Sequence, residues 1–229
     1  MIPARLLDAV PATPRTRRLR VRLDTPLIFA AGQAVLVGIA GSEQRAFYSI
    51  ASAPALGASG VLELLVAADG AFGQPGLDPM RVVGAALEVE GPFGSFGVPA
   101  AAGRAPLLLV AGGTGIAPVR SVILEHLGQP DATPVSLVYS ARAADEFAFG
   151  PELEALARDG RIALHCTVTR DEAPGWPGRT GRIDDRLLAA AMPGHEAWCL
   201  VCGPAPFVTD VAAALTRMGV DPGRVVIEK

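Results

Sequence analysis

Short apolar stretches broken by turn residues run through the first 98 residues. Such stretches lie at residues 18–24, 33–39, 47–53, 61–67 and 86–91, and Gly, Pro, Asp or Ser separate them. Short strands at this spacing are typical of small antiparallel barrels or sandwiches. The first part of the chain is therefore predicted to be an antiparallel β-barrel.

From residue 106 onward, apolar strands alternate with segments of helical periodicity. We expect strands at 106–113, 134–142, 162–170, 197–204 and 224–229, and helices at 119–127, 150–160, 184–192 and 205–219. This alternation predicts an α/β domain with a parallel sheet of the Rossmann-like type. The small-residue stretch 99–106 suits a linker, so we expect domains at 1–99 and 103–229.

Composition excludes some classes of protein. The chain has 229 residues, of which 50% are hydrophobic and 19% charged, and its net charge is −3. This composition excludes a disordered chain, and the charge does not favour nucleic acid as a partner. One basic stretch, 15–23, alternates cations with apolar residues towards its end. It predicts a strand with a solvated Arg face, while a docking patch for an acidic protein stays open: Arg15, Arg17, Arg18, Arg20 and Arg22.

Cysteine content and the absence of targeting signals point to one compartment. The three cysteines, Cys166, Cys199 and Cys202, are too few for a four-thiolate iron–sulfur site, and no metal site is predicted. The sequence begins without a basic segment and a long apolar run, and its apolar stretches are too short to cross a membrane. We expect a cytoplasmic protein with reduced thiols and no membrane partner.

A glycine-rich turn lies between the first strand and the first helix of the second half. Gly112, Gly113, Thr114 and Gly115 follow the strand, and Pro118 lies in the first helical turn. Glycines let a backbone approach a pyrophosphate, and the helix N-terminus supplies free N–H groups. This segment predicts a phosphate loop, although a tight turn without a ligand stays open.

A second turn of this kind follows the strand at 197–202. Cys202, Gly203 and Pro204 open the next helix, beside the same crevice. A buried cysteine is often a core residue. Cys202 has no obvious histidine partner, so we do not expect nucleophilic catalysis, and His126, His165 and His195 are expected to be structural or exposed.

Taken in order, several motifs resemble the ferredoxin–NADP reductase superfamily. The second half contributes AGGTGIAP, YSAR, GRTGRI and CGP, and the first half contributes GQAVLVGI, FYSIASAP and EGPFGSF. The resemblance covers nearly the whole chain. It implies a flavin-binding barrel followed by a nicotinamide-nucleotide domain, with hydride transfer between the two cofactors.

The resemblance assigns flavin contacts to one strand. The family motif Arg-x-Tyr-Ser matches Tyr48 and Ser49, which imply a stacking ring and a hydroxyl near flavin N5, with Ile50 beside them. Arg45 lies one residue too early. Either a β-bulge near Phe47 returns Arg45 to the ligand, or the flavin phosphate has another partner and Arg45 is an exposed charge.

Two further segments are assigned by the resemblance. Gly70 and Gly73 occupy the place of a Gly-x-x-Ser element that holds the flavin pyrophosphate, but Gly73 replaces the serine. The resemblance favours FAD, while FMN stays open. Residues 90–96 resemble the segment that closes the barrel against the flavin, and a simple hairpin is the alternative.

The nicotinamide nucleotide takes residues from the second half. The resemblance places Gly112, Gly113, Thr114 and Gly115 at the pyrophosphate and Cys202, Gly203 and Pro204 beside the nicotinamide. The resemblance also places four residues near the adenosine ribose: Ser140, Arg142, Arg170 and Arg179. Guanidinium groups pair well with a 2′-phosphate, so NADP(H) is favoured and NAD(H) stays open, as does a purely surface role for these arginines.

The last residues match the end of the family pattern. Relatives often end with an acidic residue, a spacer and an aromatic that covers the flavin; Glu228 and Lys229 match the first two, and the sequence stops before the aromatic. We expect tighter nicotinamide stacking as a result. Ser49, Cys202 and Glu228 are the predicted catalytic residues.

The resulting hypothesis is a flavin-dependent NAD(P)H oxidoreductase that passes electrons to ferredoxin, flavodoxin or an iron–sulfur partner subunit. Three alternatives stay open. The chain could be an NAD(P)H:flavin reductase that uses flavin as a substrate, an electron-transfer subunit of a larger redox complex, or a nucleotide-binding regulator.

Overall fold

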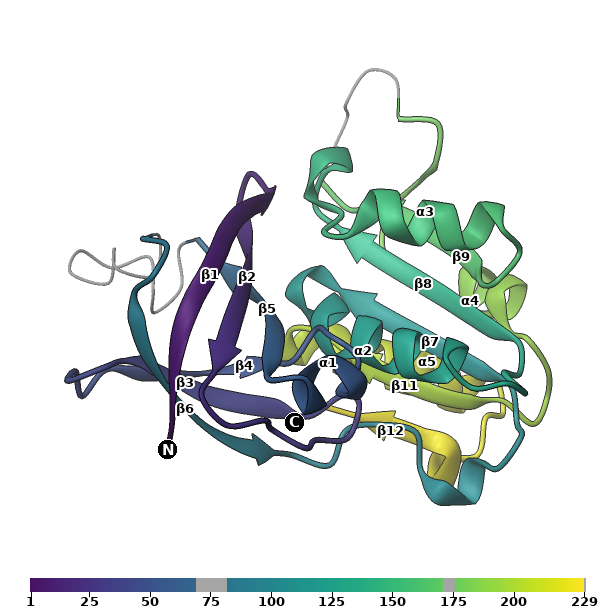
Figure 1. The fold of residues 1–229 in the computed structure, drawn as a ribbon. Helices are drawn as coiled ribbons and strands as arrows, with labels where there is room; N and C mark the ends of the chain where they lie inside the picture. The colour runs from purple at the N-terminus through teal and green to yellow at the C-terminus, as the bar shows by residue number, and fades with distance from the viewer. Residues whose placement is uncertain (69–81, 171–175, 229) are drawn as a thin grey trace.

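The first sheet is antiparallel and curls into a barrel (Figure 1). The computed structural model describes residues 1–68, 82–170 and 176–228. The sheet order is β4-β3-β6-β1-β2-β5, and a bridge from Ile50 to Leu64 connects the end of β4 to β5. The strands are β1 Ile2–Thr13, β2 Thr16–Leu23, β3 Ala34–Ile39, β4 Arg45–Ser49, β5 Val61–Ala67 and β6 Ala86–Phe93.

The predicted barrel is confirmed, but the sequence pattern missed two of its elements. Strand β1 pairs with both β2 and β6. Its two prolines obscured the strand pattern, although Leu6 lies in the barrel core. The short helix α1, Pro54–Ala58, begins at the proline where the strand prediction ended.

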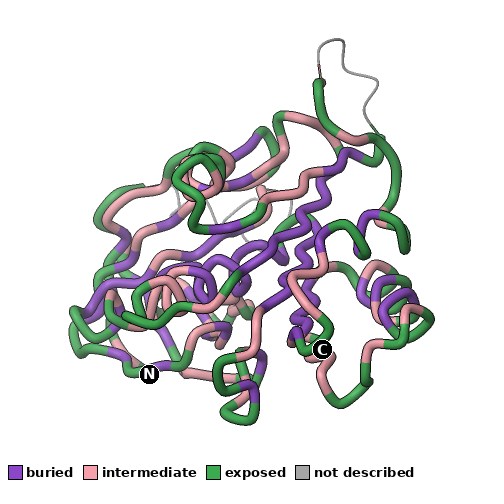
Figure 2. The backbone as a smooth tube through the Cα atoms, turned by 90° about the vertical axis from the view of Figure 1, so that its right-hand side faces the viewer, coloured by how far each residue is buried: buried purple, intermediate pink, exposed green. Residues whose placement is uncertain are grey.

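The second sheet is parallel throughout, as predicted. Its order is β10-β9-β8-β7-β11-β12. Every residue of β7 and β8 is buried, and Figure 2 shows these strands as a continuous buried interior. The strands are β7 Leu107–Gly112, β8 Val135–Ala141, β9 Ala163–Val168, β10 Arg179–Thr180, β11 Trp198–Cys202 and β12 Val225–Ile227.

Helices cover both faces of this sheet, and each face has its own core. Helices α2 and α3 pack with the cluster that contains Leu109 and Leu137, whereas α4 and α5 pack with the cluster that contains Leu108 and Val138. The helices are α2 Ile116–Leu127, α3 Gly150–Arg158, α4 Asp185–Ala191 and α5 Ala205–Arg217.

Strand order reverses at β7, which determines where a ligand can bind. The chain passes from β7 to β8 on one side, and β11 lies on the other side. In open α/β sheets, ligands bind in the crevice at the carboxyl ends of the strands where this reversal occurs. The two glycine-containing turns, after β7 and after β11, therefore flank one crevice.

The basic stretch forms β2 with the predicted alternation. Leu19, Val21 and Leu23 are buried, and the arginines between them are at least partly exposed. Part of this face is already paired, because Arg20 contacts Asp8 at 3.4 Å. No helix in the described ranges has the length and hydropathy needed to cross a bilayer.

Candidate active site between the two sheets

The glycines of the first turn have different roles. A side chain at Gly115 would lie 2.4 Å from the Cys202 carbonyl oxygen, one at Gly203 would lie 2.6 Å from the Phe207 ring, and one at Gly112 would crowd the same ring at 3.1 Å. Only Gly113 is open, with a φ of 56° and no atom within 4 Å of a Cβ position. Close approach of a ligand is therefore possible at Gly113, while the other three let the two turns pack together.

A buried tyrosine of β8 stabilises this loop through a hydrogen bond. The Tyr139 hydroxyl, at the end of β8, donates to the Gly113 carbonyl oxygen at 3.2 Å. Burial raises the pKa of Tyr139, so the phenol stays a neutral donor. Thr114 is exposed beside Gly113. The loop is thus fixed in a position that leaves its backbone open on the outer side.

The three predicted catalytic residues meet in one cluster, which we call the ring-end cluster: Ser49, Cys202 and Glu228. The Ser49 hydroxyl donates to Glu228 Oε1 at 3.0 Å, and the Cys202 thiol donates to Glu228 Oε2. Ser49 ends β4, Cys202 ends β11 and Glu228 follows β12. The cluster therefore joins the barrel to the α/β unit at the edge of the crevice.

Electrostatics keep the Cys202 thiol protonated. Burial raises the pKa of Cys202, and the Glu228 carboxylate raises it further. A protonated thiol is a poor nucleophile, in agreement with the sequence interpretation. Cys199 stands three residues before Cys202, but it belongs to the core on the opposite face of the sheet, and both thiols are free.

The β-bulge near Phe47, one of the two alternatives for Arg45, is absent. Strands β3 and β4 pair in regular register from Ala34 with Ser49 to Gly38 with Arg45. The bulge alternative is therefore excluded, because the pairing with β3 keeps strict alternation, and the other alternative holds, in which Arg45 is displaced from the ligand side. Arg45 instead forms an ion pair with Glu88 of β6 at 2.8 Å and also contacts the Met1 sulfur.

Alternation places the two aromatic residues of β4 on opposite faces. Tyr48 is partly buried and packs against the barrel core, as does Ile50, which is fully buried. Burial also raises the pKa of Tyr48. Phe47 is 64% exposed and lies edge-on to Phe93, with ring centroids 5.4 Å apart.

At the far side of the crevice, two arginines lie at adjacent strand ends. Ser140 is buried at the end of β8, and the backbone N–H of Arg170 donates to the Arg142 carbonyl oxygen at 2.9 Å. Both arginines are exposed, and neither has a carboxylate partner among the described residues. Arg179 differs, because its guanidinium binds Asp184 at 2.6 Å.

The remaining predicted residues are placed as follows. Gly203 and Pro204 form the turn between β11 and α5, and Pro204 is the N-cap residue of α5. Gly70 and Gly73 lie outside the described residues. Sequence reasoning missed the supporting residues Tyr139 and Phe207, and it missed Arg120, a buried cation on α2.

The side chains of this site are suited to positioning planar cofactor rings. The ring-end cluster offers a hydroxyl, a neutral thiol and a carboxylate, and its hydrogen bonds among the described residues involve no histidine. Among the described residues, no group of three or more His, Cys, Asp or Glu side chains could hold a metal ion. Such residues fit the reacting ends of two planar cofactors, while the flavin phosphate end finds no free cation at Arg45.

Comparison with known proteins identifies the family of this chain. Residues 109–213 match the family described as Oxidoreductase NAD-binding domain. The chain is 35% identical to Ferredoxin--NADP reductase B of Sorangium cellulosum, over 87% of this chain and 85% of that protein.

Two further relatives are longer. The chain is 32% identical to the ferredoxin--NAD(+) reductase component of the alkene monooxygenase system of Xanthobacter autotrophicus, covering 90% of this chain and 62% of that protein. A solved Amycolatopsis cytochrome P450 reductase superposes with a TM-score of 0.85 at 26% identity, over 100% of this chain and 69% of that one. The chain thus spans under two thirds of the length of the alkene monooxygenase relative.

Proposed function

This chain belongs to the ferredoxin–NADP reductase superfamily, and on that premise we propose that it is a flavin-dependent NAD(P)H oxidoreductase that passes electrons to a redox protein. The observation that carries the proposal is the ring-end cluster. Three residues from separate parts of the chain, Ser49, Cys202 and Glu228, meet at the edge of the crevice.

The residues of this cluster would align two rings. A bound flavin supplies the two-electron chemistry by accepting hydride from the nicotinamide. Ser49 would present its hydroxyl to the flavin, and Cys202 would pack as a neutral group against the nicotinamide. Glu228 holds both donors at the crevice before the rings bind, and these hydrogen bonds can exchange for contacts with the rings.

FAD is the flavin that the family resemblance favours. The reacting end of the site fits it, whereas the described residues supply no evident partner for its phosphates because Arg45 is paired with Glu88. We propose residues 1–99 as the flavin domain and 103–229 as the nucleotide domain. We also propose a cytoplasmic location, where the three free cysteines would stay reduced.

NADP(H) is the proposed nicotinamide nucleotide. Its pyrophosphate would lie on the open backbone at Gly113, beside the exposed Thr114. Arg142 and Arg170 present guanidinium groups with no carboxylate partner among the described residues, at neighbouring strand ends, where a 2′-phosphate can be bound. Loss of both guanidinium groups would then raise the KM for NADPH and leave the KM for NADH unchanged.

The proposed acceptor is ferredoxin, with flavodoxin or an iron–sulfur partner subunit as related options. Two of the relatives are named as ferredoxin reductases. The basic face of β2 is a candidate surface for an acidic acceptor, with Arg17, Arg18 and Arg22 at least partly exposed.

Flavin content and turnover test the proposal directly. The purified chain should be yellow after gel filtration, and its flavin should bleach when NADPH is added without oxygen. Addition of ferredoxin should restore the oxidised spectrum. A chain that binds flavin but is not reduced by NADPH or NADH would contradict the proposal.

One observation favours a second candidate, an NAD(P)H:flavin reductase. The ion pair between Arg45 and Glu88, at 2.8 Å, occupies the cation that would hold the flavin phosphate. Flavin could then bind weakly and leave as a product. A colourless protein that oxidises NADPH only when flavin is added, with saturation in flavin, would support this candidate over the first.

A further inference from the structure

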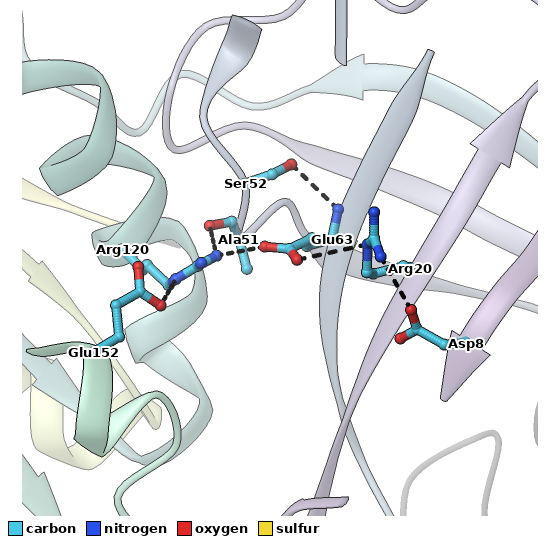
Figure 3. Close-up of polar contacts among 7 residues, drawn as sticks. All are labelled: Asp8, Arg20, Ala51, Ser52, Glu63, Arg120 and Glu152. Carbon is cyan, nitrogen blue, oxygen red and sulfur yellow. Dashed lines mark hydrogen bonds and ion pairs between the residues drawn. The ribbon is translucent and has the colours of Figure 1, made fainter. Parts of the chain in front are cut away.

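A buried arginine on α2 connects the two halves of the molecule. Arg120 is only 7% exposed. Its guanidinium donates to Glu63 Oε2 and to the Ala51 carbonyl oxygen, both at 2.8 Å, and to Glu152 Oε2 at 2.9 Å. Glu63 and Ala51 belong to the barrel, whereas Glu152 belongs to α3 (Figure 3). We call this group the clasp: Ala51, Ser52, Glu63, Arg120, Ser121 and Glu152.

The clasp holds the segment that directly follows Ser49. The Ser121 hydroxyl donates to the Ser52 carbonyl oxygen at 2.7 Å, beside the Arg120 contact with the Ala51 carbonyl. On the barrel side, the N–H of Ala51 donates to the Glu63 carbonyl oxygen at 2.8 Å. Residues 51–52 are therefore bound to both halves of the molecule at once.

Helix α3 fixes the other side of the guanidinium. Arg120 lies over the Phe149 ring, with 4.4 Å from its central carbon to the ring centroid. Phe149 precedes α3 and has a φ of 60°, a left-handed conformation that is rare for a bulky residue. Such strain persists where the surroundings hold it, here through the Glu152 ion pair in the first turn of α3.

Charges alternate across the clasp and into the barrel. Glu63 also lies 3.9 Å from Arg20, which contacts Asp8 at 3.4 Å. Figure 3 shows these side chains in one row from Glu152 to Asp8. A planar guanidinium with donors in fixed directions suits several acceptors at once, which a lysine ammonium does not.

One helix carries both the nucleotide loop and the clasp. The glycine turn ends at Gly115, where α2 begins, and Arg120 follows about 6 Å along the helix axis. Arg120 and Ser121 in turn hold Ala51 and Ser52, two and three residues beyond Ser49. The distance from the open backbone at Gly113 to Ser49 is thus fixed through a rigid helix.

We propose that Arg120 is a positioning residue that sets the alignment of the nicotinamide against the flavin-side strand. This inference rests on the proposed function. Loss of the clasp would leave nucleotide binding intact, because the loop belongs to the α/β unit alone. It would slow hydride transfer, because this step needs the two halves to be correctly positioned relative to each other.

The test compares Arg120→Met and Glu63→Gln with a control, Arg217→Met, which removes a surface ion pair to Asp185. Stopped-flow absorbance would follow flavin reduction by NADPH and reoxidation by ferricyanide. We expect Arg120→Met to lower the reduction rate at least tenfold, Glu63→Gln to lower it less, and the Kd for NADPH and the reoxidation rate to stay unchanged.

Several outcomes separate this inference from the proposed function. Reduction at the wild-type rate in Arg120→Met or Glu63→Gln would overturn the positioning role. If the flavin of the wild-type chain is not reduced by NADPH, the proposed function fails. Calorimetry of the full chain then tests separately whether the clasp holds the two halves together. Two separated unfolding transitions in Arg120→Met then support the clasp as the junction, and a single unshifted transition contradicts it.

Discussion

The barrel and the α/β unit meet at two places that are built differently. The clasp uses a buried guanidinium with three acceptors, and its carboxylates come from both halves. The ring-end cluster uses one carboxylate and two neutral donors, and Glu228 is only partly buried. Both act on the same short segment, since Ser49 belongs to one and Ser52 to the other.

This difference suggests separate tasks, in which the clasp aligns the two halves and the ring-end cluster contacts the reacting rings. A buried ion pair is difficult to rearrange, because each exposed intermediate leaves a charge without a partner. Hydrogen bonds from a hydroxyl and a thiol are weaker and can exchange for contacts with a ligand. The clasp can therefore hold the two halves while the ring-end cluster adapts when the rings enter.

The largest expected effect comes from breaking the clasp. Arg120→Met removes the cation that Glu63 and Glu152 share. Glu63 keeps Arg20 at 3.9 Å and Glu152 is partly exposed, so the loss should not exceed the cost of breaking a fully buried ion pair, about 3–5 kcal/mol. Urea unfolding followed by circular dichroism would measure the loss. The double variant Arg120→Met/Glu63→Gln should recover part of it. A loss below about 1 kcal/mol would place the junction elsewhere.

Removal of the Ser49 hydroxyl should affect rate much more than stability. Ser49→Ala deletes one hydrogen bond to Glu228, so the unfolding free energy should fall by about 1 kcal/mol or less. Misplacement at the reacting rings should slow flavin reduction by about 10- to 100-fold. Ser59→Ala, which removes an exposed hydrogen bond on α1, is the control. Equal rates for the two variants would contradict the distinction between the junctions.

High pH should weaken the thiol-containing strand β11. Burial raises the pKa of Cys199 from 9.0 to about 11, so above pH 9 the unfolded chain releases this proton while the folded chain keeps it. Cys199 should therefore contribute a fall in the unfolding free energy of about 1.4 kcal/mol per pH unit between pH 9 and pH 11, in addition to the contributions of Cys166 and Cys202, whose pKa values burial also raises. Urea titrations at half-unit steps would show the slope. Cys199→Ala should lower the slope by about 1.4 kcal/mol per pH unit, and an identical slope in that variant would contradict the assignment.

The smallest effect is expected on the surface, away from both junctions. Arg217 and Asp185 form an exposed ion pair at 2.7 Å. Such pairs are screened by water and salt, so Arg217→Met should leave the unfolding midpoint and the reduction rate unchanged within error. A large loss in either measurement would show that α4 and α5 influence the crevice.

Much of the fold could be predicted because local patterns and burial agree. Apart from the two-residue strand β10, which the pattern missed, the strands and helices of the second half follow the alternation of apolar segments, and the glycine turns follow β7 and β11. Strand β1 was missed because Pro3 and Pro11 interrupt its pattern. The resemblance to a known family supplied what spacing alone does not, namely that Ser49, Cys202 and Glu228 belong together.

Partners that depend on packing could not be predicted from the sequence. Arg45 forms its ion pair across β3, and only the register of three strands shows that Glu88 is within reach. Arg120 and Glu63 carried a signal that went unused. Each is a lone charge in an apolar segment, IAPVRSVI and VLELLVA, and lone charges in buried elements usually have a partner.

The separation in sequence between Ser49 and Glu228 has a consequence for synthesis. The two residues that meet at 3.0 Å are 179 positions apart, and Gly115 packs against Cys202, which follows much later. The barrel strands all lie before residue 94, so this part can fold while the ribosome is still adding the rest. We expect a nascent chain to be able to collect its flavin early yet to stay unreactive towards NAD(P)H until β12 has been added. Unfinished chains would then not leak electrons to oxygen.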